Sequence, residues 1–147
     1  MGAVTAELAE RQMQIYEGVG AWPAPANDNW PPVFSPTNRK RLVILESPYA
    51  GDIERNVAYA RACLRDSLMR GEAPIASHLL YTQPGVLDDN LPDERILGID
   101  AGLSWRFVAE ASVVYTDLGM SKGMSYGIQR ARDAGKVIEY RTIGWGE

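Results

Sequence analysis

The sequence predicts an α/β fold in which a parallel sheet is covered by helices. Short apolar segments that are typical of buried strands alternate with longer segments whose apolar residues recur at helical spacing. The alternation begins at residue 41 and follows the order β-α-β-α-β-α-β to residue 141. Parallel strands need crossover connections, so this order indicates right-handed crossovers with helices packed on the sheet.

Length, charge and cysteine content limit the class of protein. A chain of 147 residues suits one domain with a substantial core. The formal net charge of −4 argues against binding to a nucleic-acid polymer, because such proteins usually present a basic surface. Cys63 is the single cysteine, so an internal disulfide is excluded and a buried small side chain is expected. We find no signal peptide and no apolar segment of membrane-spanning length, and expect a cytoplasmic protein.

Residues 1–38 differ in composition from residues 39–147, which we take as the α/β domain. Residues 4–19 are rich in Ala, Glu, Gln and Leu and predict a helix. Residues 21–38 contain five prolines together with Trp22 and Trp30, which predicts an extended arm lying on the domain or on a neighbouring subunit. A disordered linker is the alternative.

The first half of the domain reads as a strand, a turn and a helix. Residues 41–46 (RLVILE) form a continuous apolar run, typical of a central strand covered on both faces. Asp52 can cap a helix that runs to about Arg70, where Gly71 ends it. The apolar residues expected on one face of this helix are Ile53, Val57, Ala60, Leu64 and Leu68.

The second half continues the alternation. Residues 74–81 (PIASHLLY) are predicted to form the second strand, and residues 82–92 a polar loop. Asp93 opens a helix that carries Ile96, Ile99, Leu103, Phe107 and Val108. The last elements are a strand at 112–117, a helix up to Ala134 and a strand at 136–141.

A glycine-punctuated loop follows the third strand and opens the last helix. Ligands of parallel sheets lie beyond the carboxyl ends of the strands, and amides at a helix start suit an anion. We therefore expect Asp117, Ser121 and Ser125 nearest to a ligand. The ligand-binding residues predicted in this loop are Asp117, Gly119, Ser121, Gly123, Met124 and Ser125. An ordinary strand-to-helix connection is the alternative, because the glycine spacing is not the dinucleotide fingerprint.

Polar residues also follow the first two predicted strands. Ser47 and Tyr49 come after the first strand and His78 at the end of the second, and all three are predicted to bind the ligand. Glu46 closes an apolar strand, where a carboxylate would be buried unless it faced a ligand or partner. Burial would raise its pKa and suit acid–base chemistry; a hydrogen-bonded structural role is the alternative. We expect no metal site around His78, because no residues show ligand spacing.

Four pieces of the sequence carry a resemblance to a known family. They are LVILESPYAG followed by Asn56 and Ala60, then SHL, then Asp100 and Trp105 ahead of ASVVYTD, and finally SKGMSYGIQRARDAGKVIEY. In this order they resemble the nucleoside 2-deoxyribosyltransferase-like superfamily over residues 41–143. That superfamily includes deoxynucleoside monophosphate N-glycosidases and uncharacterised phage and bacterial domains. The resemblance implies a flavodoxin- or Rossmann-like parallel sheet of four to five strands with flanking helices, to which the N-terminal helix and proline-rich arm are additions.

The resemblance also implies a nucleoside or nucleotide site at the strand ends. In active members a glutamate attacks the anomeric carbon and an aspartate on the preceding helix supports the base. Asp100 matches that aspartate, and Ser121 matches a position that is serine in the monophosphate hydrolases, where it would suit a phosphate. Gly127 stands where the nucleophilic glutamate is expected, and Ile44 where the family has an aromatic hydroxyl. A glycine can be neither the nucleophile nor the acid of a glycosyl-enzyme mechanism.

Three functions remain open at this point. The first is a binding module that sequesters or senses a nucleotide and lacks the nucleophile, which Gly127 favours. The second is an N-glycosidic bond hydrolase or transferase with a rearranged carboxylate set, Glu46 and Asp100. The third is a structural oligomer without a ligand. We expect a homo-oligomer without a cofactor, and neither a membrane nor a nucleic-acid polymer as partner.

Overall fold

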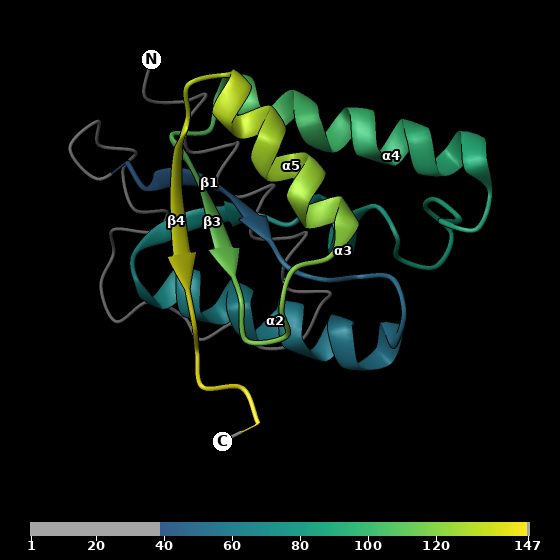
Figure 1. Ribbon diagram of the computed structural model, residues 1–147, viewed down its shortest axis with the longest axis horizontal. Helices are drawn as coiled ribbons and strands as arrows, with labels where there is room; N and C mark the ends of the chain where they lie inside the picture. The colour runs from purple at the N-terminus through teal and green to yellow at the C-terminus, as the bar shows by residue number, and fades with distance from the viewer. Residues whose placement is uncertain (1–38, 147) are drawn as a thin grey trace, which may run out of the picture. The chain divides into compact units, whose positions relative to one another are not determined.

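A computed structural model describes residues 39–146, and they form an α/β unit of the flavodoxin- or Rossmann-like kind (Figure 1). Its sheet is parallel and has the strand order β2-β1-β3-β4. The strands are β1 (Arg41–Glu46), β2 (Glu72–Ile75), β3 (Ala111–Tyr115) and β4 (Val137–Arg141). The predicted fold class is therefore confirmed. The helix predicted at 4–19 and the arm at 21–38 lie outside the described residues.

The helices cover both faces of this sheet. They are α2 (Ile53–Met69), α3 (Ser77–Leu80), α4 (Pro92–Ser104) and α5 (Lys122–Asp133), with a 3₁₀ turn η2 (Trp105–Phe107) after α4. Figure 1 shows α2 on one side of the strands and both α4 and α5 on the other. In the sheet, β2 pairs with one edge of β1 and β3 pairs with its other edge, so the connections from β1 to β2 and from β2 to β3 run in opposite directions. The gap between the carboxyl ends of β1 and β3 is thus a topological switch point, where α/β proteins bind ligands.

The larger part of the core lies between the sheet and α2. Successive side chains of a strand point to opposite faces, so Val43, Leu45 and Val113 share one face. They pack with Tyr59 and Cys63 of α2, and all five side chains are buried. The expectation that Cys63 is a buried small side chain is confirmed.

A smaller cluster lies on the opposite face. Val114 packs there against Met124 and Ile128 of α5, with Ile138 of β4 beside them. This cluster covers the β3–β4 half of the face. The β1 half presents Ile44 and Glu46, and it is here that the pocket described below is found.

The predicted bounds of α2 are close to those observed, but its predicted buried face is confirmed only in part, at Ala60 and Leu64. Asp52 caps the helix by accepting a hydrogen bond from the Arg55 amide, and Gly71 ends it with a φ of 84°. Ile53 and Leu68, predicted to face the core, are 45% and 58% exposed. The buried residues are Asn56, Tyr59, Ala60, Cys63 and Ser67. Polar residues can occupy this face because they have partners: the Asn56 amide, for example, donates to two backbone carbonyls.

The prediction for the second strand is wrong beyond Ile75. The strand begins at Glu72 and ends at Ile75, and His78 lies in the short helix α3 instead of at a strand end. A short apolar run does not distinguish a strand from a helix by periodicity. The helix predicted from Asp93 also ends early, at Ser104, so that Phe107 and Val108 lie beyond it and are exposed.

Two helices approach closely at Gly102, which has no side chain to hold them apart. A Cβ atom at this position would lie 2.8 Å from Cβ of Ser77 in α3. We expect Gly102→Ala to lower the free energy of unfolding by about 1–3 kcal/mol, because α3 and α4 would have to separate. Urea denaturation measures this change.

Gly123→Ala is the matched control for that substitution. Its Cβ atom would meet only Oγ of Ser121, at 3.9 Å. Alanine is also the better helix former, so the control should stabilise the protein by up to about 1 kcal/mol. Equal effects of the two substitutions would contradict the close approach at Gly102.

Candidate functional site

A pocket of about 380 Å³ opens on the face of the sheet that α4 and α5 cover. Its floor is formed by Ile44 and Glu46 of β1 and Ser112 of β3, at the topological switch point. One wall is α5, and the other is built by α3, the loop after it and α4. This volume is within the range of small-molecule sites, roughly 300–1,000 Å³.

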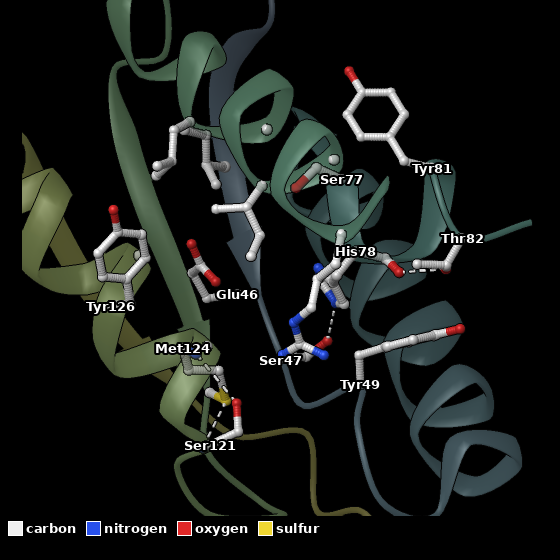
Figure 2. A pocket seen from close by; sticks show the side chains of 18 of the residues that line it. Glu46, Ser47, Tyr49, Ser77, His78, Tyr81, Thr82, Ser121, Met124 and Tyr126 are labelled. Atoms are coloured by element: carbon white, nitrogen blue, oxygen red, sulfur yellow. Dashed lines mark hydrogen bonds between the residues drawn. The ribbon is translucent and has the colours of Figure 1, made fainter. Parts of the chain in front are cut away.

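The carboxyl group of Glu46 is the most unusual feature of the pocket. Figure 2 shows it between Tyr126 on one side and Ser77 and His78 on the other. Within the part of the chain that the structure describes, no side chain or amide donates a hydrogen bond to it, and no cation pairs with it. Burial raises its pKa to about 8, so the group is largely protonated at neutral pH. The side chain is partly exposed to the pocket, and a carboxyl group that faces a pocket with a raised pKa and without a protein partner points to a ligand.

Gly127 of α5 leaves the space that this carboxyl group occupies. A Cβ atom at position 127 would lie 3.0 Å from Cδ of Glu46 and closer still to Oε1. Any larger residue would therefore require the carboxyl group to move. The Glu46 side chain of β1 fits in this place because Gly127 of α5 has no side chain.

A second polar group of the pocket is a hydrogen-bonded pair. Oγ of Ser47 and Nε2 of His78 are 2.7 Å apart, as the dashed line in Figure 2 marks. Burial lowers the pKa of His78 to about 4, so its imidazole ring is neutral near pH 7. Near pH 7 the pocket thus contains a largely protonated carboxylic acid, Glu46, and a neutral imidazole, His78. Active sites often hold such an acid and base, because their surroundings shift the pKa values of the two groups.

The beginning of α5 forms the third polar region. Ser121 is the N-cap, and its Oγ accepts a hydrogen bond from the Met124 amide at 3.2 Å. The first amides of a helix have no acceptor within it and attract negative charge. Ser121, Lys122 and Gly123 all line the pocket.

Charged groups elsewhere in the lining are mostly paired. Arg95 forms an ion pair with Asp89 at 2.9 Å, and Arg106 donates to the carbonyl of Leu103 at 2.7 Å. Arg130 pairs with Asp133 at 3.9 Å, while its Nε is buried and has no hydrogen-bond partner within the described residues.

The structure brings most of the predicted site residues together. Those that line the pocket are Glu46, Ser47, Tyr49, His78, Ser121, Gly123 and Met124. Those outside its lining are Asp100, Asp117, Gly119 and Ser125. Asp100 is exposed on α4 and away from Glu46, because the residues of α4 that line the pocket, such as Gly98, Ile99 and Gly102, lie on another face of the helix.

Asp117 holds the C-terminal segment instead of facing the pocket. Its carboxylate accepts hydrogen bonds from the hydroxyl of Tyr59 and from the amides of Ile143 and Trp145. These donors keep the pKa of Asp117 low against the opposing effect of burial. It occupies the α2 side of the sheet because it follows Tyr115, which also faces α2, by two residues.

Sequence reasoning missed several lining residues. Ser112 is one whose signal was present: a polar residue within the apolar run of a buried strand is best explained by a cavity on that face. Tyr81, Arg106 and Arg130 gave no such signal, since exposed aromatic and basic residues are common on helices. Trp105 donates to the hydroxyl of Tyr81 at 3.0 Å and is not part of the core.

The fold and the pocket define a class: a parallel α/β protein with a pocket at its topological switch point. Within this class the chain belongs to the family described as "Domain of unknown function (DUF7768)", whose model matches residues 41–141. No curated protein matches the chain. Among the described residues, no helix has the length and apolar character needed to cross a membrane.

Proposed function

We propose that this protein binds a nucleoside or nucleotide in the pocket over β1 and β3. The observation that carries the proposal is the carboxyl group of Glu46, which faces the pocket at the switch point without a partner among the described residues. An unpartnered carboxyl group at such a place is explained when a bound ligand supplies its hydrogen bonds. A nucleobase, with donors and acceptors along one edge of a flat ring, has the required chemistry.

The remaining parts of a nucleotide also find suitable surroundings. Ile44, Ile99 and Leu103 offer apolar contacts to a ring, and Tyr126 offers an aromatic face. The start of α5, with Ser121 and Lys122, suits a 5′-phosphate. The resemblance to the nucleoside 2-deoxyribosyltransferase-like superfamily supports the same ligand class.

Thermal unfolding in the presence of nucleosides and deoxynucleoside 5′-monophosphates tests this proposal. A ligand at 100 times its dissociation constant stabilises the folded state by about 2.7 kcal/mol, which raises the melting temperature by several degrees. Ser121→Ala should weaken the binding of monophosphates more than that of nucleosides. Failure of every nucleoside and nucleotide to raise the melting temperature would contradict the proposal and favour a structural protein without a ligand.

An N-glycosidic bond hydrolase or transferase is the second candidate. The proximity of Gly127 and Glu46 favours it, because a carboxyl group from β1 fills the space beside the position where the resemblance expects a catalytic glutamate. A neutral carboxylic acid could protonate the departing base. Asp100 does not line the pocket of this chain, so the rearranged pair of carboxylates has only Glu46 in place.

Chromatography of each reaction mixture distinguishes the two candidates. Release of free base that is lost in Glu46→Gln identifies an enzyme, whereas binding without free base identifies a sequestering or sensing module. Turnover that survives Glu46→Gln would exclude a catalytic role for this residue. A homo-oligomer in the cytoplasm remains part of the proposal, and light scattering at micromolar concentration tests the oligomeric state.

A further inference from the structure

The carboxyl group of Glu46 offers two adjacent hydrogen-bonding atoms to the interior of the pocket. In its neutral form one oxygen donates and the other accepts, whereas the ionised form only accepts. The apolar surroundings and the absence of a donor among the described residues favour the neutral form. Gly127 packs against this group and limits where it can point.

We infer that Glu46 recognises the edge of a nucleobase by a paired hydrogen bond, in which its neutral carboxyl group both donates and accepts. The inference rests on the proposed nucleotide binding and specifies the contact that selects the base. The matching edge carries an acceptor beside a donor, either a ring nitrogen next to an amino group or a ring N–H next to a carbonyl. Ionisation of Glu46 would remove the donor and place two acceptors opposite a ligand acceptor.

Binding should therefore depend on the protonation of Glu46, so the groups that surround it matter. The cations of the lining are Lys122 and Arg130 from α5, Arg95 from α4 and Arg106 from η2. The other titratable groups are His78 from α3, Tyr126 from α5, Glu94 from α4, Asp89 from the loop, and tyrosines 49 and 81. None of them forms a hydrogen bond or ion pair with Glu46 in the described residues, and burial is what raises its pKa.

Titration calorimetry at two pH values tests the inference, with the 5′-monophosphates of deoxyadenosine, deoxycytidine, deoxyguanosine and thymidine as probes. For the wild-type protein we expect the dissociation constant of the tightest-binding probe to rise about 30-fold between pH 6.5 and pH 9.5, because each pH unit above a linked pKa costs about tenfold. Glu46→Gln keeps one donor and one acceptor, so it should bind at pH 6.5 within about threefold of the wild type. The affinity of this variant should change much less with pH. Because the probes titrate in the same way with both proteins, the difference between the two pH dependences reports on Glu46 alone.

Two further variants separate recognition from stability. Glu46→Leu removes both hydrogen bonds and should weaken binding at least tenfold at pH 6.5. Gly127→Ala displaces the carboxyl group and should weaken binding similarly, whereas Gln129→Ala, at an exposed position of the same helix outside the pocket lining, should not. The melting temperature of each variant shows that it is folded.

Two results would overturn the inference, and they differ from a failure of the proposed function. One is a wild-type protein and a Glu46→Gln variant with the same dependence on pH. The other is a Glu46→Leu variant that binds as tightly as the wild type. If neither the four nucleotides nor the corresponding nucleosides bind to the wild type at either pH, the proposed function itself is refuted, and this inference with it.

Discussion

Glu46→Gln is expected to stabilise the folded protein by about 2–4 kcal/mol at pH 9 and by less than about 1 kcal/mol at pH 5. In the folded state the pKa of Glu46 is about 8, well above its usual 4.5. Below pH 4.5 the group is neutral whether the chain is folded or unfolded, so it imposes no penalty. As the pH rises from 4.5 to 8 the unfolded state ionises first, and the wild type loses stability relative to the variant.

Urea denaturation of both proteins from pH 5 to pH 9 measures this difference. Asp100→Asn is the matched control for the loss of a carboxylate, because Asp100 is exposed on α4 and lies outside the pocket. A difference for Glu46→Gln that does not change with pH would show that the carboxyl group of Glu46 is solvated in the folded state. A gain in stability on replacing Glu46 would agree with its proposed role, because residues of binding sites are often retained at a cost in stability.

Arg141→Met should have the largest destabilising effect, about 3–5 kcal/mol. The Arg141 guanidinium forms a two-pronged ion pair with Glu72, with distances of 2.7 and 2.8 Å, and both side chains are less than 10% exposed. The pair with Glu72 connects β4 to the beginning of β2 across the sheet, and Arg141 also binds Glu139 of β4 at 2.6 Å. Removing Arg141 would leave the buried Glu72 with a hydrogen bond from Ser67 and a longer ion pair to Arg41 at 3.5 Å.

The effect of Arg141→Met should depend on pH in the opposite sense to that of Glu46→Gln. The Arg141 guanidinium lowers the pKa of Glu72 to about 2, so the pair contributes fully above pH 4.5. Its contribution is lost as the pH falls from 4.5 toward 2, and the two proteins should then converge in stability. Arg95→Met is the control: its ion pair with Asp89 is more exposed and should contribute less than about 1 kcal/mol. Equal losses for the two arginine variants would contradict the argument.

The fold could be predicted because its strands differ clearly from their surroundings. The run at 41–46 is apolar on both faces, and glycines such as Gly71 mark where helices end. The buried face of α2 could not be predicted from apolar residues, because Asn56 and Ser67 are buried with partners just outside the helix, in the turn before it and at the start of β2. The end of β2 was missed because the apolar run that contains it continues into a helix.

The candidate site could be predicted in part. Glu46 was identified because a charge at the end of a buried strand needs an explanation, and the structure places it in the pocket. Asp117 was misplaced because the sequence shows that it follows a strand but not which face of the sheet it joins. Tyr115, two residues earlier, packs on the α2 face of the sheet, and Asp117 lies on the same side. The packing of Tyr115 is known only from the structure.

The shared space of Glu46 and Gly127 has a consequence for the history of the family. One volume beside β1 can hold one carboxyl group, supplied from the strand or from the helix but not from both. Substitutions at the two positions should therefore be linked across related sequences: an acidic residue at 127 should accompany a small residue at 46.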